Sequence, residues 1–486
     1  MHLKALIVDV NSARIVGKCT EEWESVIVTG LSDDSRYVCQ GDLFFCRVGE
    51  NFDTHTFAAE AKRRGAVAIV CERELDVGLP QVLVDDGREA MARIAATFYG
   101  YPSKRLQVIG ITGTNGKTTT SYLLASIFRA AGKSVGIIGT LGIYYGRKRI
   151  APELTTPDPI FLQKTLADMV REGVEYAVME VSAHALHYQK DASIHYAACI
   201  FTNFTQDHLD FFKTMESYGE AKKKLFSKKK TPLCIINGDD CFGREIGSER
   251  GEGVVYYGME TPSDAFALIT AENVRGTELV LNVMDDLGRV SLSLAGRHNV
   301  YNALAAATCA RCLGIPMENI ACGLTAVEKV DGRLELVGSF HGAYVFVDFA
   351  HTPDGLTQSI SSLRRHTSGR LICLFGCGGN RDQAKRPLMG EAVARLADFA
   401  VLTSDNPRFE DPMDIISAIE KGYRKYSNRY VIVPEREKAI EYAMELLSAG
   451  DILLVAGKGG ERYQEIMGIK YLLSDNDIIK NRIGGA

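Results

Sequence analysis

The sequence predicts an α/β protein of three domains, each built around a largely parallel sheet. Three observations lead to this prediction. The chain has 486 residues, and a typical domain holds about 150. Short apolar, β-branched segments alternate with helical segments along nearly the whole chain, and this alternation is typical of parallel sheets with helices on both faces. No tandem repeat or low-complexity linker interrupts the pattern.

The composition is that of a soluble globular protein without a large excess of charge. Hydrophobic residues make up 46% and charged residues 24% of the chain, and the formal net charge is -5. We therefore expect no nucleic-acid partner. We also expect no membrane partner, because no apolar run approaches the roughly 20 residues of a membrane span. The 12 cysteines show no His/Cys cluster at zinc spacing and are expected to be reduced thiols in the cytoplasm.

The first domain is expected over residues 1–103. Its strand-like segments are "ESVIVTG", "GAVAIVCE" and "PQVLVDD", and its helical segments are "THTFAAEAKRRG" and "REAMARIAATFYG". The stretch "YGYPSKR" then brings Gly, Pro and Ser together before the next apolar run. These residues interrupt regular structure, so they mark the first boundary.

The second domain is expected over residues 104–337. It begins with the buried strand "LQVIGIT", a glycine loop and the helix "TTSYLLASIFRAAG", which stops at Gly132. Further strands are expected at "YAVMEVS", "AACIFTNF" and "LCIINGDD". A basic helix is expected near "SYGEAKKKLFSKKK".

The third domain is expected over residues 338–486, where the alternation restarts. Its strands are expected at "AYVFVDFAH", "RLICLFGCGG", "FAVLTSDN", "YVIVPE" and "DILLVAGKG". Each is followed by a helical or glycine-rich segment, which is typical of a doubly wound parallel sheet.

The loop "GTNGKTT" between the first strand and helix of the second domain predicts a nucleoside triphosphate site. Gly113 and Gly116 let backbone N–H groups approach phosphate oxygens, Lys117 neutralises the outer phosphates, and Thr118 offers a hydroxyl to Mg²⁺. The spacing departs from the strict phosphate loop, because Ile111 occupies the position expected to be glycine.

The loop resembles the ATP loop of the Mur ligase family, the ATP-dependent amino-acid ligases of peptidoglycan synthesis. Other segments match the family in the same order, namely "LTTPDP", "MEVSAHAL", "NFTQDHLDF", "GRHNVYNALAA", "DGRLE", "VDFAHTPDGL", "GCGGNRDQAKRPLMG", "TSDNPRFEDP" and "GKGGERYQ". They are most similar to those of the ligase that adds meso-diaminopimelate to UDP-N-acetylmuramoyl-L-alanyl-D-glutamate. The resemblance implies a small UDP-binding α/β domain, a central P-loop-type ATPase domain and a C-terminal Rossmann-like domain.

The resemblance also implies the reaction. ATP phosphorylates a carboxylate to an acyl phosphate, and an amine then displaces the phosphate, so that an amide forms and ADP and phosphate are released. The implied substrates are ATP, the UDP-N-acetylmuramoyl-dipeptide and meso-diaminopimelate. The implied setting is cell-wall biogenesis, on which cell shape and division depend, with a monomeric enzyme in the cytoplasm.

The catalytic residues implied by the resemblance are Lys117, Glu180, His208 and Lys222. Thr118 and Glu180 would serve one Mg²⁺, and His208 would help to hold a second. Glu180 and His208 each follow an apolar strand, where parallel sheets place ligand sites. Lys222 is the position of the family's carbamylated lysine, in which CO₂ turns the amine into an anion able to approach Mg²⁺. The residues alone do not distinguish Lys222 from Lys223 and Lys224 in "YGEAKKKLF".

The ATP site implied by the resemblance combines the loop with three later motifs. Arg333 is expected to reach phosphate, because its guanidinium is planar and always charged, and His351 lies near Asp348 in the motif. The ATP-binding residues are Gly113, Thr114, Asn115, Gly116, Lys117, Thr118, Thr119, Asn299, Arg333 and Asp348.

The UDP-peptide site implied by the resemblance lies mainly in the first domain. Its residues are Asp33, Ser35, Glu50, Asn51, Phe52, Thr155, Thr156, Ser182 and Lys190. Lys190 stands where the family usually has Arg, which keeps the charge but loses the two-pronged hydrogen bonding of a guanidinium.

The incoming amino acid would be bound by the third domain. The residues implied are Arg381, Asp405, Asn406, Pro407, Arg408, Gly457 and Glu461. Two positions depart from the family pattern: Asn380 replaces the usual Asp, and Gly460 replaces the usual His. Glu461 stays in register, so we expect a modified pocket wall.

Three alternatives remain open. The same ligase could add L-lysine, although "DNPR" favours diaminopimelate. A folylpolyglutamate synthase-like ligase shares the central domain but lacks a UDP-binding first domain. A nucleotide-switched binding module or P-loop motor would give the acceptor residues Arg381, Arg408 and Glu461 no role.

Overall fold

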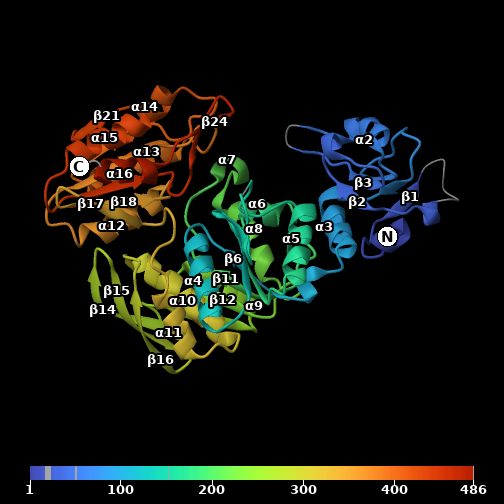
Figure 1. Cartoon of the computed structure of the whole chain (residues 1–486), viewed down its shortest axis with the longest axis horizontal. Coiled ribbons are helices and arrows are strands. Elements are labelled where there is room, and N and C mark those ends of the chain that lie inside the picture. Colours follow the sequence, from blue (N-terminus) through green and yellow to red (C-terminus); the bar gives the residue numbers. More distant parts are fainter. Residues whose placement is uncertain (17–22, 50–51, 152, 485–486) are drawn as a thin grey trace. The chain divides into compact units, whose positions relative to one another are not determined.

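The computed structural model describes residues 1–16, 23–49, 52–151 and 153–484, and it confirms the predicted α/β class with three sheet-based regions (Figure 1). The predicted substrate residues Glu50 and Asn51 lie outside the described residues. The chain forms two compact units, the first comprising residues 1–110, 133–199 and 224–232, and the second residues 111–132, 200–223 and 233–486. The boundaries expected at 103 and 337 stay predictions.

The N-terminal region holds a five-stranded sheet in the order β1-β5-β4-β3-β2. Its strands are β1 (Arg14–Val16), β2 (Gly30–Ser32), β3 (Asp42–Phe45), β4 (Ala68–Cys71) and β5 (Gln81–Leu83). All neighbouring pairs are parallel except β1 with β5. Its α-helices are α1 (Leu3–Leu6), α2 (Ala58–Arg64) and α3 (Gly87–Phe98), and its 3₁₀ turns are Trp23–Ser25, Ser35–Tyr37, Thr54–Phe57 and Pro102–Lys104.

Strand β3 shows why this sheet has helices on both faces. Leu43 and Phe45 pack with Met91 and Ile94 of α3, whereas Phe44 packs with Ala58 and Ala61 of α2. Successive side chains of a strand point to opposite faces. The continuous apolar run of β3 therefore fills two cores.

The central region holds an eleven-stranded sheet in the order β16-β15-β14-β13-β12-β11-β6-β10-β7-β8-β9. Its strands are β6 (Gln107–Thr112), β7 (Val135–Gly139), β8 (Gly142–Tyr145), β9 (Lys148–Ile150), β10 (Tyr176–Glu180), β11 (Tyr196–Phe201), β12 (Cys234–Asn237), β13 (Val254–Gly258), β14 (Ala265–Asn273), β15 (Gly276–Val283) and β16 (Asp286–Leu292). Strands β6 and β11 contribute residues to both units.

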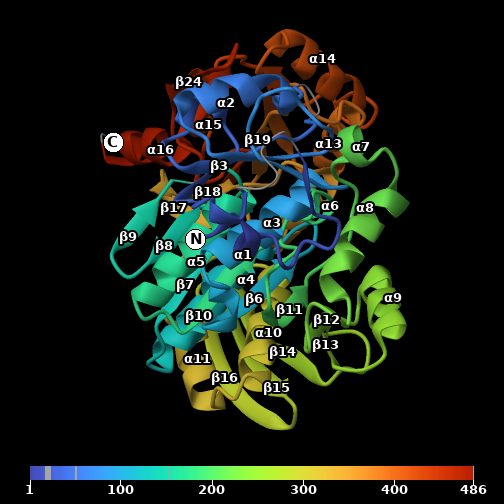
Figure 2. The same ribbon diagram turned by 90° about the vertical axis from the view of Figure 1, so that its right-hand side faces the viewer.

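Both ends of this sheet are antiparallel, which the alternation of strands and helices did not predict. Strands β7, β8 and β9 form one antiparallel end, and β14, β15 and β16 form the other. Figure 2 shows the latter meander beside α10 and α11. Alternation along the chain indicates an antiparallel sheet here, because buried and more exposed residues alternate in β15.

The helices of the central region include the one that begins directly after the glycine loop. They are α4 (Lys117–Ala130), α5 (Pro159–Arg171), α6 (Ala183–His187), α7 (Leu209–Phe212), α8 (Met215–Lys223), α9 (Cys241–Arg250), α10 (Arg297–Cys312) and α11 (Met317–Thr325), with a 3₁₀ turn at Lys224–Phe226.

The C-terminal region holds a six-stranded sheet in the order β17-β18-β22-β19-β20-β21, in which only β17 is antiparallel to its neighbour. Its strands are β17 (Glu335–Phe340), β18 (Ala343–Asp348), β19 (Leu371–Phe375), β20 (Phe399–Leu402), β21 (Tyr430–Ile432) and β22 (Ile452–Ala456). A separate hairpin is formed by β23 (Tyr463–Ile466) and β24 (Ile469–Leu472).

Helices cover both faces of this C-terminal sheet. One core contains apolar residues of α12 (Pro353–Arg364), α13 (Lys385–Leu396) and α14 (Pro412–Tyr423). The other contains those of α15 (Arg436–Glu445) and α16 (Asp475–Gly484). The predicted doubly wound arrangement is therefore confirmed.

In the portion of the chain that the structure describes, none of the helices combines the length and the apolar character needed to cross a membrane.

Candidate active site

The glycine loop joins β6 to α4, and both of its glycines are required by the backbone. Gly113 has φ 147° and Gly116 has φ 87°, conformations that other residues rarely adopt. A Cβ atom would lie 1.9 Å from Thr202 Oγ1 at Gly113 and 2.4 Å from Asn302 Oδ1 at Gly116. The loop therefore exposes backbone rather than side chains at the start of a helix, which is where anions bind.

Neighbouring residues hold this loop in place. Asn203 accepts hydrogen bonds from the Thr114 amide through its carbonyl (2.9 Å) and from the Asn115 amide through Oδ1 (2.8 Å). Thr202 Oγ1 donates to the Asn115 carbonyl at 2.6 Å. The loop is thus fixed by the chain that follows β11, where the motif "NFTQDHLDF" begins at Asn203.

Lys117 and Thr118, the first residues of α4, are hydrogen-bonded to the loop and to a distant motif. The Lys117 ammonium curls over its own loop, donating to the carbonyls of Gly113 at 2.9 Å and Thr114 at 2.8 Å. The Thr118 hydroxyl accepts a hydrogen bond from Arg333 Nη2 at 2.9 Å, while Thr119 is buried. The structure therefore brings together the loop and the distant motif "DGRLE".

Lys222 is buried in α8, unlike the two lysines that follow it. Its side chain is 1% exposed, and Nζ lies 4.4 Å from the centre of the Tyr218 ring. Lys223 instead forms ion pairs with Glu220, Glu245 and Glu249, and Lys224 is exposed. The three lysines that the sequence could not distinguish thus have different environments.

The surroundings of Lys222 favour its neutral form. Burial lowers the pKa of the amine well below its ordinary value, and the nearby positive charge of Lys117 lowers it further, against the opposing effect of Asp207. No described carboxylate lies within ion-pair distance of Nζ. A neutral amine is a nucleophile, so Lys222 is chemically suited to accept CO₂.

Asp207 is a buried carboxylate at the centre of a cluster of titratable side chains. Its carboxylate lies 3.3 Å from His208 Nε2, 3.8 Å from His351 Nε2 and 3.6 Å from Lys385 Nζ. Burial acts to raise the pKa of Asp207, but His208, Lys385 and His351 together hold it below its usual range. The pKa of His351 is lowered, chiefly by burial and then by Lys385. Asp207 therefore carries a negative charge beside the Lys385 ammonium and two imidazole rings.

Two residues expected to contact ATP are instead bonded mainly to the chain itself. Asn299, in α10, donates to the Ala295 carbonyl at 2.8 Å and accepts from Asn302 at 3.1 Å. Asp348 Oδ1 accepts from the amides of Leu334 at 3.0 Å and Phe349 at 2.9 Å. Asp348 thus fixes the backbone beside Arg333, and a direct ATP contact of either residue stays a prediction.

A second group of candidate residues lines a cavity of about 340 Å³ in the first unit. Phe52 and Lys190 were expected there, and Lys190 also forms an ion pair with Asp158 at 2.9 Å. Asp33 pairs with the lining residue Arg47 at 3.0 Å; burial raises the pKa of Asp33 and Arg47 opposes that rise. Ser35 begins the 3₁₀ turn that Asp34 caps.

Two cations of this cavity were not among the expected residues. Arg47 and Arg88 line it together with Tyr188, Thr54, Gly49 and Met91. Arg88 lies over the Tyr188 ring, with 4.3 Å from Cζ to the ring centre, and donates to the Val48 carbonyl at 2.8 Å. With Lys190, these arginines give the cavity three positive side chains, which suits an anionic ligand.

Glu180, at the end of β10, is held within the first unit. Its carboxylate accepts from the Thr140 amide at 2.9 Å and the Thr140 hydroxyl at 3.0 Å. The Thr156 hydroxyl donates to the Glu180 carbonyl at 2.9 Å and accepts from the Ser182 amide at 3.0 Å, and Thr155 contacts Thr140. These expected residues lie together around the carboxyl end of β10.

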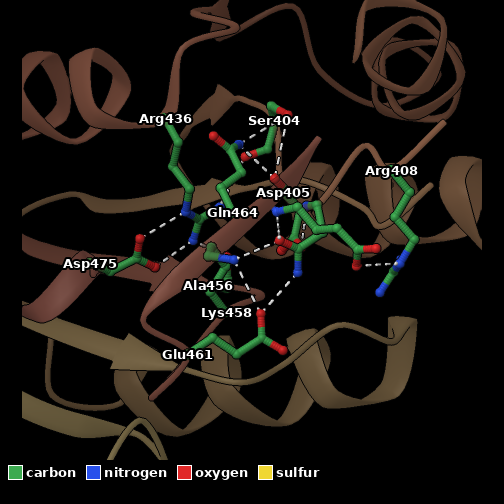
Figure 3. Close-up of polar contacts among 11 residues, drawn as sticks. Ser404, Asp405, Arg408, Arg436, Ala456, Lys458, Glu461, Gln464 and Asp475 are labelled. Carbon is green, nitrogen blue, oxygen red and sulfur yellow. Dashed lines mark hydrogen bonds and ion pairs between the residues drawn. The ribbon is translucent and has the colours of Figure 1, made fainter. Parts of the chain in front are cut away.

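The residues expected to bind the amino acid form a polar network in the C-terminal region. Asn406 donates to Glu461 at 2.9 Å and accepts from Lys458 at 3.0 Å. Lys458, which is fully buried, also donates to Glu461 at 3.1 Å, as Figure 3 shows. Asp405 lies against Gly457, where a Cβ atom would come within 2.5 Å of its carboxylate.

The buried ion pair Arg436–Asp475 lies next to this network. Arg436 binds Asp475 through two hydrogen bonds of 2.8 and 2.6 Å and donates to the Ala456 carbonyl at 3.0 Å (Figure 3). Burial acts to raise the pKa of Asp405, but Lys458 and Arg436 hold it below its ordinary value. The positive charges of Lys458 and Arg436 therefore favour the ionised form of Asp405.

Arg408 and Arg381 both lie close to Gly378. A Cβ atom at Gly378 would lie 3.0 Å from Arg408 Nη1 and 3.8 Å from Arg381 Cγ. Arg381 is exposed, whereas Arg408 forms an ion pair with Glu465 at 3.2 Å. The Pro407 carbonyl leaves no room for a side chain at Gly379. Asn380 Oδ1 accepts from the Phe409 amide at 3.0 Å, so this unusual residue helps to fix the arginine loop.

The residues present fit the groups that the sequence implies. The bare backbone of the loop with Lys117 suits a triphosphate, and the Thr118 hydroxyl is an oxygen ligand of the kind that Mg²⁺ prefers. Within the described ranges, no three His, Cys, Asp or Glu side chains group as a metal site. Thr118 and His208 belong to the second unit and Glu180 to the first, so joint metal ligation stays a prediction.

Sequence reasoning missed Arg47, Arg88, Asp207, Lys385 and Lys458. Asp207, Lys385 and Lys458 stand inside the quoted motifs "NFTQDHLDF", "GCGGNRDQAKRPLMG" and "GKGGERYQ", which was an available signal. No sequence signal pointed to Arg88, because its contact with the Tyr188 ring exists only in the folded chain.

Three protein-family models match the chain. They are the Mur ligase family catalytic domain over residues 27–99, the Mur ligase middle domain over 111–310 and the Mur ligase glutamate ligase domain over 332–459. Together the three matched segments cover most of the chain and follow one another without overlap.

Curated relatives match over nearly their whole length. A protein of Geobacillus kaustophilus named UDP-N-acetylmuramoyl-L-alanyl-D-glutamate--2,6-diaminopimelate ligase is 43% identical, with 90% of this chain and 91% of that protein covered. One of Clostridium acetobutylicum, whose name differs only by a final 1, is 42% identical, with 98% and 97% covered.

Solved structures of similar proteins also match the chain over most of its length. The structure of a UDP-N-acetylmuramoyl-L-alanyl-D-glutamate--2,6-diaminopimelate ligase matches with a TM-score of 0.69 and 31% identity, covering 95% of this chain and 96% of that one. MurF from Acinetobacter baumannii, at 23% identity and a TM-score of 0.65, covering 88% and 90%, shares the fold. On this evidence the chain belongs to the Mur ligase family.

Proposed function

We propose that this chain is an ATP-dependent ligase that adds meso-2,6-diaminopimelate to UDP-N-acetylmuramoyl-L-alanyl-D-glutamate. The observation that carries the proposal is the full-length similarity to relatives named for that reaction. The geometry supports it, because a phosphate loop, a cavity with three cations and a network of charged side chains occur in one chain.

The chain's residues have separable tasks in the two steps. In the first, a carboxylate oxygen of the dipeptide attacks the γ-phosphorus and the bond to ADP breaks. Lys117 supplies positive charge at the transferring phosphoryl group, where transition-state charge is largest. Arg333, held against Thr118, is positioned to add a second cation. Thr118 and Glu180 would hold one Mg²⁺ and His208 would help to hold a second, and the bound cations would supply positive charge to the phosphate oxygens.

In the second step the amine nitrogen of the incoming amino acid attacks the acyl carbon, and phosphate leaves with the electron pair of the broken bond. The attacking amine loses a proton, which the departing phosphate can accept. Asp207 lies 3.8 Å from His351 and 3.6 Å from Lys385. The ammonium group of Lys385, beside Asp207, is suited to hold the departing phosphate.

Lys222 is proposed to carry a carbamate. Carbamylation forms a bond between Nζ and the CO₂ carbon and releases one proton, so that a buried amine becomes an anion. The supporting observations are its burial and its lowered pKa, which make the amine nucleophilic without a high pH. The carbamate would then help to hold a second Mg²⁺.

The remaining parts of the proposal concern setting and assembly. Cytoplasmic location and a monomeric enzyme follow from the resemblance to the family and from nothing else. The proposed role is in peptidoglycan precursor synthesis, with no nucleic-acid or membrane partner.

The direct test is a ligation assay that offers ATP, the UDP-dipeptide and either meso-diaminopimelate or L-lysine. We expect tripeptide product, ADP and phosphate in equal amounts with diaminopimelate, and little product with lysine. Lys117→Ala serves as the inactive control. ATP hydrolysis that needs no UDP-dipeptide would contradict the ligase proposal, and preferential use of L-lysine would contradict only its substrate.

A further inference from the structure

Helix α6 ends in a backbone conformation that glycine normally supplies. Gln189, which follows its last turn, has φ 53°, in the left-handed region that glycine favours and asparagine tolerates. The Lys190 amide donates to the Ala185 carbonyl at 2.9 Å, and the Gln189 amide donates to the Leu186 carbonyl at 3.4 Å. These two bonds form the common helix-ending motif with a left-handed residue. Glycine would serve there without strain, so glutamine at this position indicates a role for its side chain.

The side chain of Gln189 is bonded to Asp86, 103 positions earlier in the chain. Gln189 Nε2 donates to Asp86 Oδ2 at 2.7 Å. The other carboxylate oxygen, Oδ1, accepts from the amides of Arg88 at 2.9 Å and Glu89 at 3.2 Å, and so caps the start of α3. Asp86 thus divides its two oxygens between its own helix and Gln189.

The two segments joined by this hydrogen bond both line the cavity of about 340 Å³. Arg88 and Met91 of α3 line it from one segment, and Tyr188 and Lys190 line it from the other. Arg88 Cζ also lies 4.3 Å from the centre of the Tyr188 ring. Both sequence neighbours of Gln189 therefore line the cavity, and its bond to the start of α3 fixes their backbone relative to that helix.

We propose that Gln189 is a positioning residue for the anionic ligand of this cavity. Its hydrogen bond to Asp86 fixes the segment that carries Lys190 relative to the helix that carries Arg88. The inference rests on the proposed function, in which the ligand is the UDP-N-acetylmuramoyl-dipeptide. A ligand with several negative charges engages several cations at once, so the spacing of cations on different segments matters. Without the bond the ligand must order these segments when it binds, which lowers its affinity.

The competing explanation is that Gln189 only terminates α6. Glycine at this position separates the two roles, because it adopts the left-handed conformation without strain but has no side chain to reach Asp86. Asparagine also tolerates the conformation and keeps an amide group, but it is one methylene shorter. If helix termination were the whole role, both substitutions would leave ligand binding unchanged.

The test compares Gln189→Gly and Gln189→Asn with the wild-type enzyme. We expect KM for the UDP-dipeptide to rise by about tenfold in both, the size of one lost hydrogen bond to a charged group. Its Kd, measured by calorimetry without ATP, should rise by the same factor. KM for ATP and kcat should change less than about twofold, and Tm should not fall in Gln189→Gly. Gln358→Asn, at an exposed position of α12, is the matched control and should change none of these values.

A double-mutant cycle tests the partner. Asp86→Ser keeps a residue type that caps helices but removes the carboxylate oxygen that reaches Gln189. We expect this variant to raise KM for the UDP-dipeptide by itself. Combined with Gln189→Gly it should lose no more than the larger single loss, because both substitutions remove the same bond. Losses that add would overturn the inference, since they would show that the two side chains act independently.

An unchanged KM for the UDP-dipeptide in Gln189→Gly overturns the inference while the wild type still performs the ligation. An equal rise in KM for ATP, or a fall in Tm of Gln189→Gly, overturns it in favour of a general structural role. A wild type that neither binds nor ligates the UDP-dipeptide instead refutes the proposed function, and this inference with it.

Discussion

Arg333 Nη2 donates a hydrogen bond to the hydroxyl of Thr118, a residue 215 positions earlier in the chain, at 2.9 Å. The guanidinium also lies over the Phe349 ring, with Cζ 4.4 Å from its centre, and Asp348 fixes the backbone of the neighbouring Leu334. Contacts with Thr118 and with residues 348–349 therefore hold Arg333 at the start of α4, the helix that follows the phosphate loop.

Replacing Arg333 by lysine should raise KM for ATP by about tenfold or more. Lysine keeps the charge but loses the planar fork that can engage Thr118 and a phosphate at once. Steady-state phosphate release at varied ATP measures the change. Arg275→Lys, at an exposed position of the β14–β15 turn, is the matched control and should leave KM for ATP unchanged; an effect there of similar size would show that the loss is not specific to position 333.

Lys222→Ala should be nearly inactive, and short-chain carboxylic acids should restore part of the activity, because a diffusing carboxylate can occupy the position of the carbamate. Lys223→Ala should retain most activity, since its ammonium is engaged by Glu245 and Glu249 at the surface. Activity is measured by product formation with and without added acetate or propionate. Equal losses in both variants without any rescue would favour a general charge effect.

Arg408→Ala should lose diaminopimelate turnover by a factor of about 100 or more while KM for ATP and for the UDP-dipeptide stays nearly constant. A guanidinium–carboxylate pair is among the stronger charge-assisted contacts, and Arg408 also shapes the loop through the Gly379 carbonyl. Full initial-rate kinetics with each substrate varied in turn separates the effects. Selectivity for diaminopimelate that survives the substitution would exclude Arg408 as its source.

Arg88→Ala should raise KM for the UDP-dipeptide by about tenfold, the size expected for one lost charged contact. Arg88 lines the cavity of about 340 Å³ and stacks on Tyr188. KM for ATP should not change. Arg36→Ala offers a comparison, because that arginine is exposed and pairs with Asp34 outside the cavity lining. Equal behaviour of the two variants would argue against binding of the UDP-dipeptide by Arg88.

Asp239 should make folding sensitive to acid. Burial acts to raise its pKa, but hydrogen bonds from the Thr261 hydroxyl, the Met259 amide and Tyr301 lower it to about 2. Because the folded-state pKa lies below the ordinary value, the stabilisation is present above about pH 4 and is lost as the pH falls toward 2. Asp239→Asn should therefore lower Tm at pH 7.

The difference in Tm between wild type and Asp239→Asn should shrink between about pH 4 and pH 2, as followed by circular dichroism. Asp285→Asn, at an exposed turn position, should show no such trend. A constant difference across this range would mean that the charge of Asp239 does not contribute.

The sequence predicted the elements whose signal is local. The glycine loop was recognisable because the order of Gly113, Gly116, Lys117 and Thr118 is read directly along the chain, and the α/β class followed from alternating apolar segments. The antiparallel meander β14–β16 was missed because that alternation was extended over a stretch whose hydrophobic period is two.

The site depended on contacts that sequence order does not contain. Lys222, Lys223 and Lys224 are chemically identical in the sequence, and only packing buries the first and gives the second three glutamate partners.

The same limit applies to Asp207 and Lys385, which lie 3.6 Å apart, and to Arg408 and Glu465. The sequence by itself determined the residue types and the motif order, because these are read along the chain. The tertiary structure decided which charges meet and which become buried, because pKa and charge pairing depend on distance and on exclusion of water.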